Sequence, residues 1–156
     1  MTLTDRDNAP PTLADTDSLD QLASKDDHIT SDEILRRWEA IYSAALLELE
    51  RLRSGGGLRV GDWQGLSNEE LDEFHELTDF IYQVGGVGDW DYDCDLIPES
   101  GWVDYVQELA SDTAHEISLD DWPYYCIDWE YAARELHWGG DYSIVTVSAG
   151  SWYIRN

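Results

Sequence analysis

The residues of this sequence with the clearest chemical meaning are carboxylates, and they are concentrated in one stretch. Residues 60–133 contain 20 aspartates and glutamates and no lysine or arginine. The same stretch holds tryptophan and phenylalanine residues at regular apolar spacing, whereas a disordered acidic tail has few aromatic residues. Because a folded surface with charge of one sign repels itself, this composition indicates a role other than stability.

Rows of carboxylates at regular intervals resemble the phosphates of a nucleic acid. Carboxylates four residues apart on a helix are separated by about 6 Å along its axis, and those two residues apart on a strand by about 6.6 Å. Both intervals are close to the distance between neighbouring phosphates of one strand. We therefore predict that carboxylates of this stretch bind a basic groove in place of phosphates: Asp62, Glu69, Glu70, Asp72, Glu73, Glu76, Asp79, Asp89, Asp91, Asp93, Asp95, Glu99, Asp104, Glu108, Asp112, Glu116, Asp120 and Asp121.

Two predicted helices would hold the first and last of these rows. One begins after Ser67, which forms a capping box with Glu70, and ends at Gly85. Its predicted buried stripe comprises Leu71, Phe74, Leu77, Ile81 and Val84. Another helix is predicted from Ser100, with an inner face of Trp102, Val103, Val106, Leu109 and Ala110. Between them, residues 89–95 alternate strictly, so a strand would place four carboxylates on one side. Reversing Glu69, Glu73 and Glu76 to lysine is expected to weaken partner binding and to leave the fold intact.

An earlier predicted helix has an ordinary surface and serves as the comparison. Thr30 and Glu33 form its capping box, and three glycines at 55–57 end it. Asp32 precedes Arg36, and Glu33 precedes Arg37, by four residues, which is the favourable order for ion pairs. Like charges at this spacing lower helix stability by about 0.2–0.5 kcal/mol per pair. The predicted acidic helices contain several such pairs.

The chain is predicted to be an α+β protein, with a mainly helical acidic body and a C-terminal unit of a helix and a β-hairpin. The last helix is expected at 128–137, and the hairpin has strands at 142–147 and 152–155 with a turn at 148–151. Trp38, Phe74, Ile81, Val103 and Val106 are predicted core residues. The expected segments are a disordered acidic tail at 1–29, an N-terminal helix at 30–57, an acidic helical region at 58–117 and the C-terminal unit at 118–156.

The sequence gives little support for an enzyme or a metalloprotein. The four histidines lack any metal-binding or catalytic spacing, and there is no phosphate-binding glycine loop or nucleophile motif. An EF-hand loop starting at Asp89 would need glycine and glutamate where Cys94 and Ser100 stand. We expect no cofactor and no bound metal. The two cysteines fit no metal site or disulfide framework. There is no apolar run of membrane-spanning length and no signal-peptide pattern, so a cytoplasmic protein is expected.

The net charge of −25 excludes nucleic acid and anionic membranes as partners and favours a basic protein. A plain acidic surface that aids solubility is the simplest alternative. An acidic immunity protein for a basic nuclease toxin and an anti-CRISPR DNA mimic are two others. Trp122, Tyr124 and Tyr125 form an aromatic cluster that is a candidate homodimer contact, although core packing is the preferred explanation for it.

The run from Tyr125 to Leu136 resembles a signature of the ArdA antirestriction proteins, in which a similar motif precedes a polar turn and a terminal strand pair. Residues 101–110 and 66–74 look like two further helices of that family, and the resemblance covers roughly residues 60–156. It departs at the N-terminus, where the family has a small strand-rich domain. The resemblance implies a phage or mobile-element protein that mimics DNA and occupies the DNA-binding groove of type I restriction–modification enzymes, often as a dimer.

Overall fold

A four-stranded antiparallel sheet with helices on both faces forms the centre of the protein. The computed structural model describes residues 10–25, 27–55, 65–85, 94–113 and 118–156. The sheet has the order β1-β2-β4-β3, with β1 at Ile29–Thr30, β2 at Asp95–Pro98, β3 at Tyr142–Val147 and β4 at Gly150–Arg155. The predicted α+β fold is confirmed, and the helical body contributes two strands to the sheet that contains the predicted hairpin.

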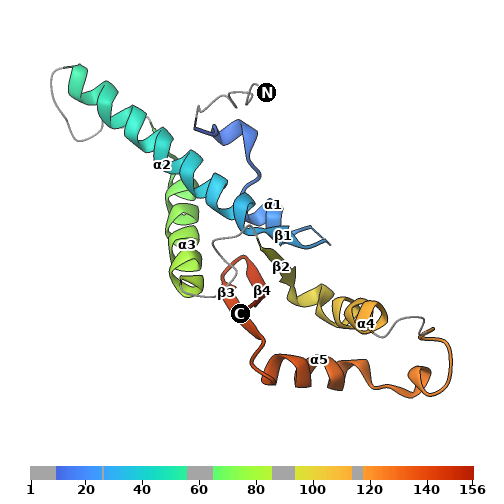
Figure 1. Ribbon diagram of the computed structural model, residues 1–156. Helices are drawn as coiled ribbons and strands as arrows, with labels where there is room; N and C mark the ends of the chain where they lie inside the picture. The colour runs from blue at the N-terminus through green and yellow to red at the C-terminus, as the bar shows by residue number, and fades with distance from the viewer. Residues whose placement is uncertain (1–9, 26, 56–64, 86–93, 114–117) are drawn as a thin grey trace, which may run out of the picture.

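The two faces of the sheet bury different side chains because neighbouring residues on a strand point to opposite sides. Leu96, Val145, Trp152 and Ile154 belong to a larger core with residues of α1 (Leu19–Ala23), α2 (Ser31–Ser54) and α3 (Asn68–Val84). Ile97, Tyr142 and Tyr153 belong to a second core with residues of α4 (Trp102–Thr113) and α5 (Trp129–Trp138). The two acidic helices, α3 and α4, therefore lie in different layers (Figure 1).

The predicted disordered tail is wrong for residues 10–25 and 27–29. A short 3-10 helix, η1 (Leu13–Asp15), is followed by α1, and Ser18 and Gln21 close a capping box at the start of α1. Leu19 and Leu22 are each 2% exposed in the larger core, and Ile29 is fully buried in β1. The segment is ordered because these side chains bury apolar surface. Residues 1–9 lie outside the described residues.

Both predicted capping boxes are present, at the starts of α2 and α3. Thr30 accepts a hydrogen bond from the Glu33 amide, and Ser67 does the same for Glu70. The predicted buried stripe of α3 is partly wrong. Leu77, Phe80 and Val84 are buried, but Leu71 is 37% exposed. The buried face of α3 includes Phe80, which was not in the predicted stripe, because α3 packs on β3 as well as on α2.

Of the five predicted core residues, Val106 alone is buried, with 6% of its surface exposed. The other four, Trp38, Phe74, Ile81 and Val103, pack at the edges of the two cores. The ring of Trp38 stacks on those of Tyr42 and Phe74, with centroids 5.2 and 5.6 Å apart. The Trp38–Phe74 stack therefore packs α2 against α3.

Trp102 organises the second core. It stacks on Tyr153 with ring centroids 4.1 Å apart, and its indole N–H donates to the Ala133 carbonyl of α5 at 3.0 Å. Helix α4 begins at Trp102, after a 3-10 turn, η3 (Glu99–Gly101), at the predicted start. Helix α5 begins after Asp128, whose side chain accepts from the Tyr131 amide at 3.0 Å.

The predicted hairpin is confirmed with a tighter turn. Val147 pairs with Gly150, so the turn consists of Ser148 and Ala149 rather than residues 148–151. Strand β3 lies at the edge of the described sheet. The side-chain amide of Gln83 in α3 donates to the Thr146 carbonyl at 2.9 Å and accepts from the Thr146 N–H at 3.2 Å. Helix α3 is thereby attached to the outer backbone of β3.

Candidate acidic interaction surface

Helix α4 presents a row of three carboxylates to solvent. Asp104, Glu108 and Asp112 are exposed, and Trp102 and Val106 are buried on the opposite side. The four-residue interval separates neighbouring carboxylates by about 6 Å along the helix axis. Within the described part of the chain, none of the three forms an ion pair with a lysine or arginine. These three residues, hereafter the α4 row, are placed as the sequence predicts.

A shallow hollow adjoins the α4 row. It has a volume of about 200 Å³ and includes Asp104, Glu108 and Tyr105 of α4 together with Asp27 and His28. Asp27 and His28 come from the segment before β1, which the sequence assigned to a disordered tail. The carboxylate of Asp27 therefore adds to the negative charge beside the α4 row.

Helix α3 presents a second set of three carboxylates, which are less regularly spaced than the α4 row. Glu69, Asp72 and Asp79 are exposed on its outer side. The other acidic residues of the helix have partners. Glu70 accepts from the Ser67 amide at 2.7 Å in the capping box, and Glu76 accepts a hydrogen bond from the Ser148 hydroxyl of the hairpin turn.

Glu73 is a structural residue, and its assignment to the phosphate-like array is wrong. Its carboxylate binds the Arg37 guanidinium in two places, at 2.9 Å to Nε and 2.8 Å to Nη2. It also accepts from the Leu19 amide at 2.7 Å. The Arg37 side chain is 8% exposed and the Glu73 side chain is 13% exposed. Paired, charge-assisted hydrogen bonds of this kind are the strong ones.

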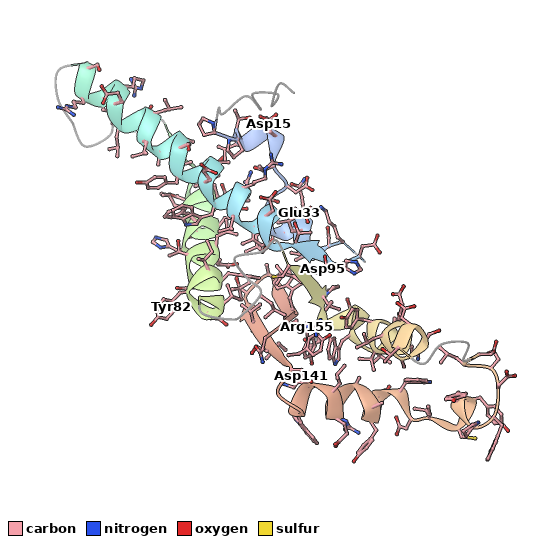
Figure 2. The ribbon with its side chains drawn as sticks, in the orientation of Figure 1. Asp15, Glu33, Tyr82, Asp95, Asp141 and Arg155 are labelled. Atoms are coloured by element: carbon pink, nitrogen blue, oxygen red, sulfur yellow. The ribbon has the colours of Figure 1, made fainter. Side chains whose placement is uncertain are left out.

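Arg37 connects this ion pair to the N-terminal segment. Its Nη1 donates to the Leu13 carbonyl at 3.1 Å and contacts the carbonyl and hydroxyl oxygens of Thr16. The predicted Glu33–Arg37 pair is therefore absent, and Glu33 binds Lys25 at 2.7 Å instead (Figure 2 labels Glu33). The predicted Asp32–Arg36 pair is present at 3.6 Å. Reversing Glu73 to lysine is therefore expected to destabilise the fold, contrary to the sequence-based expectation.

A feature of the sequence could have indicated that Arg37 is buried and needs an acidic partner. Arg37 lies between Ile34 and Ile41 at helical spacing, on the side of α2 that is otherwise apolar. A buried charge needs a partner of opposite charge. The pattern did not identify which of the many acidic residues would be that partner.

The N-terminal segment and α3 enclose an acidic hollow. Its volume is about 370 Å³, and Asp20 and Ser18 of the N-terminal segment line it together with Glu69, Asp72 and Glu76 of α3. Asp20 lies in the predicted tail and was not among the predicted site residues. Its carboxylate enlarges the negative surface around α3.

The remaining predicted carboxylates are distributed along the other elements. Asp95 opens β2 and is labelled in Figure 2, and Glu99 follows β2; both are exposed, as are Asp120 and Asp121. Five members of the array lie outside the described residues: Asp62, Asp89, Asp91, Asp93 and Glu116. The predicted strand at 89–95 is described only from Cys94 onward, where Asp95 begins β2.

The aromatic cluster before α5 is on the surface. Trp122 is 74% and Tyr125 63% exposed, and Tyr124 is half-buried in the 3-10 helix η4 (Tyr124–Cys126). Core packing, the preferred explanation from sequence, is therefore wrong for Trp122 and Tyr125. Their role as a dimer contact stays a prediction.

Two tyrosines of the second core, Tyr105 in α4 and Tyr153 in β4, favour their neutral form. Burial, followed by a 2.9 Å hydrogen bond with the Tyr142 hydroxyl, raises the pKa of Tyr105 well above its ordinary value. Burial also raises the pKa of Tyr153, with a smaller contribution from the negative charge of Glu99. Both shifts disfavour the phenolate, so these groups support packing and hydrogen bonding at neutral pH.

In the described residues, no three histidine, cysteine, aspartate or glutamate side chains are grouped so that they could hold a metal ion. Among the same residues, no helix combines the length and apolar character that a membrane span requires.

Comparisons with known proteins found no match: no family model, no curated protein and no solved structure is similar to this chain. The arrangement of its carboxylates therefore carries the functional argument.

Proposed function

We propose that the protein is a non-enzymatic inhibitor that competes with DNA for the basic groove of a DNA-binding enzyme. The α4 row supports this best. Three carboxylates stand at phosphate-like intervals on a rigid helix, and no described cation neutralises them. A basic groove would supply the missing positive charge, and the binding would weaken as salt rises.

Type I restriction–modification enzymes are the first target to test, and this choice rests on the resemblance of residues 125–142 to the ArdA antirestriction proteins. The proposed place of action is the cytoplasm of a bacterial host, where a phage or mobile element meets such enzymes. An anti-CRISPR DNA mimic would use the same surface with a different target.

The acidic immunity protein remains as a second proposal, because the free carboxylates of α3 and α4 lie in different layers. An inhibitor of a single basic nuclease needs only one of the two sets. A mimic of a DNA duplex would use both along one groove, and it would inhibit several unrelated restriction systems.

Competition for DNA tests the proposal directly. The full chain is titrated into a type I methyltransferase bound to labelled DNA, at low and at physiological salt. We expect stoichiometric displacement that weakens with salt. Absence of displacement at both salt concentrations would exclude this target and direct the search to a basic nuclease or a CRISPR effector.

A matched pair of variants then locates the contact. One variant carries Asp104→Asn, Glu108→Gln and Asp112→Asn. The control carries Glu50→Gln, Glu130→Gln and Glu135→Gln, which removes the same charge from α2 and α5. We expect displacement by the first variant to be at least about tenfold weaker, since it loses three charged contacts. Equal potency of the two variants would exclude the α4 row as the contact.

A further inference from the structure

Helix α2 carries a stripe of exposed apolar side chains. Leu35, Tyr42, Leu46 and Leu49 are 37%, 44%, 47% and 43% exposed. Their helical spacing places them on one side of α2, hereafter the α2 stripe. Beside its start is an apolar hollow of about 160 Å³ formed by Leu35, Trp38, Thr78 and Ile81. A contiguous apolar surface of this kind marks an interaction site on a soluble protein.

The outer half of α2 is accessible to a large partner. Figure 1 shows this half extending beyond α3 and away from the sheet. Tyr42 lies next to the Trp38–Phe74 stack, and Leu46 and Leu49 follow it further along the helix. The stripe thus continues from the hollow along the extended part of the helix.

Charge indicates what kind of partner fits the stripe. Residues 31–54 contain five acidic residues and four arginines, whereas residues 60–133 contain 20 acidic residues and no arginine or lysine. Two copies of so acidic a chain therefore repel each other less where α2 meets α2 than where the acidic stretches at 60–133 meet. Glu39 and Arg53 border the stripe and are exposed, and neither has an ion-pair partner among the described residues.

We propose that two copies of this chain associate through their α2 stripes as an antiparallel helix pair with a two-fold axis near Leu46. In this arrangement Tyr42 packs opposite Leu49 of the second copy. Arg53 lies beside Glu39 of the second copy, on the same side of the interface. The two-fold axis forms this ion pair twice, which is how a self-complementary interface is built. The interface uses neither the α4 row nor the aromatic cluster at Trp122, and it does not depend on the proposed function.

Two leucines at neighbouring positions give a matched test. Leu46 lies on the stripe, whereas Leu47 is 73% exposed and about 100° further around the helix. Sedimentation equilibrium of the full chain, from low to high micromolar concentration, measures self-association of the wild type, Leu46→Asp and Leu47→Asp. We expect dimers of the wild type and of Leu47→Asp, and monomers of Leu46→Asp. Circular dichroism checks that each variant is folded.

Charge reversal tests the orientation of the pair. Glu39→Arg and Arg53→Glu should each raise the dissociation constant about tenfold, because each change converts two attractions into repulsions. The double variant should restore association. A monomeric wild type at every concentration, or equal effects of Leu46→Asp and Leu47→Asp, would overturn the proposal. Loss of the dimer on Trp122→Ala, with no effect of Leu46→Asp, would overturn it in favour of the aromatic cluster.

Discussion

Helices α3 and α4 have similar sequences, but their carboxylates have different roles in the structure. Each has an apolar face and a series of acidic residues without any lysine or arginine. The carboxylates of α4 are all exposed, whereas α3 uses Glu70 for its capping box, Glu73 for Arg37 and Glu76 for the hairpin turn. Uniform charge in a sequence therefore does not imply a uniform surface, because individual carboxylates can hold neighbouring elements together.

Replacing Glu73 should give the largest difference between the two helices. Glu73→Gln removes the negative charge that balances buried Arg37, and breaking a buried ion pair costs about 3–5 kcal/mol of unfolding free energy. Denaturant unfolding measures this loss, with Glu108→Gln in α4 as the control. A loss below about 1 kcal/mol would show that Arg37 finds another partner or becomes hydrated.

The N-terminal segment should be the next most sensitive part, because it packs on the α3 side of the protein. Leu22 is 2% exposed, and truncating such a side chain costs about 2–5 kcal/mol. Leu22→Ala is therefore expected to lower stability in denaturant unfolding. Leu47→Ala, at an exposed site, is the control. Equal stability of the two variants would contradict the packing of α1.

Alkaline pH should act on the α4 side through its tyrosines. The folded-state pKa values of Tyr105 and Tyr153 are raised above the ordinary 10.0. The stability that these groups contribute is fully present below pH 10 and is lost as pH rises through the folded pKa values. Thermal unfolding at a series of pH values should show this decline, and Tyr105→Phe should reduce it. An unchanged slope in that variant would assign the decline to other groups.

Neutralising the α4 row should have the smallest effect on stability, and of opposite sign. Its two like-charge pairs at four-residue spacing each cost about 0.2–0.5 kcal/mol. Asp104→Asn with Glu108→Gln and Asp112→Asn is thus expected to raise the unfolding free energy by about 0.4–1 kcal/mol. A measured loss of stability would show that the row supports the fold after all, as Glu73 does.

Local signals in the sequence were the reliable ones. The capping boxes at Thr30 and Ser67 involve residues three apart, and both were predicted correctly. The outward direction of Asp104, Glu108 and Asp112 follows from helical spacing relative to Trp102 and Val106, and it too was predicted.

Features that depend on tertiary packing were missed. Arg37 and Glu73 are 36 residues apart, and nothing local distinguishes Glu73 from its acidic neighbours. Helix α1 has five residues, which is too short for helical periodicity to be visible in the sequence. The exposure of Trp122 and Leu71 likewise depends on which side of each element faces the sheet.

Gln83 has a consequence for how this protein behaves at high concentration. An edge strand exposes unpaired backbone groups that can accept a strand from another molecule and begin aggregation. The carboxamide of Gln83 presents one donor and one acceptor to the Thr146 backbone, as a neighbouring strand would. A single side chain from α3 therefore occupies the outer edge of β3 near the hairpin turn and hinders growth of an intermolecular sheet at that end of the strand.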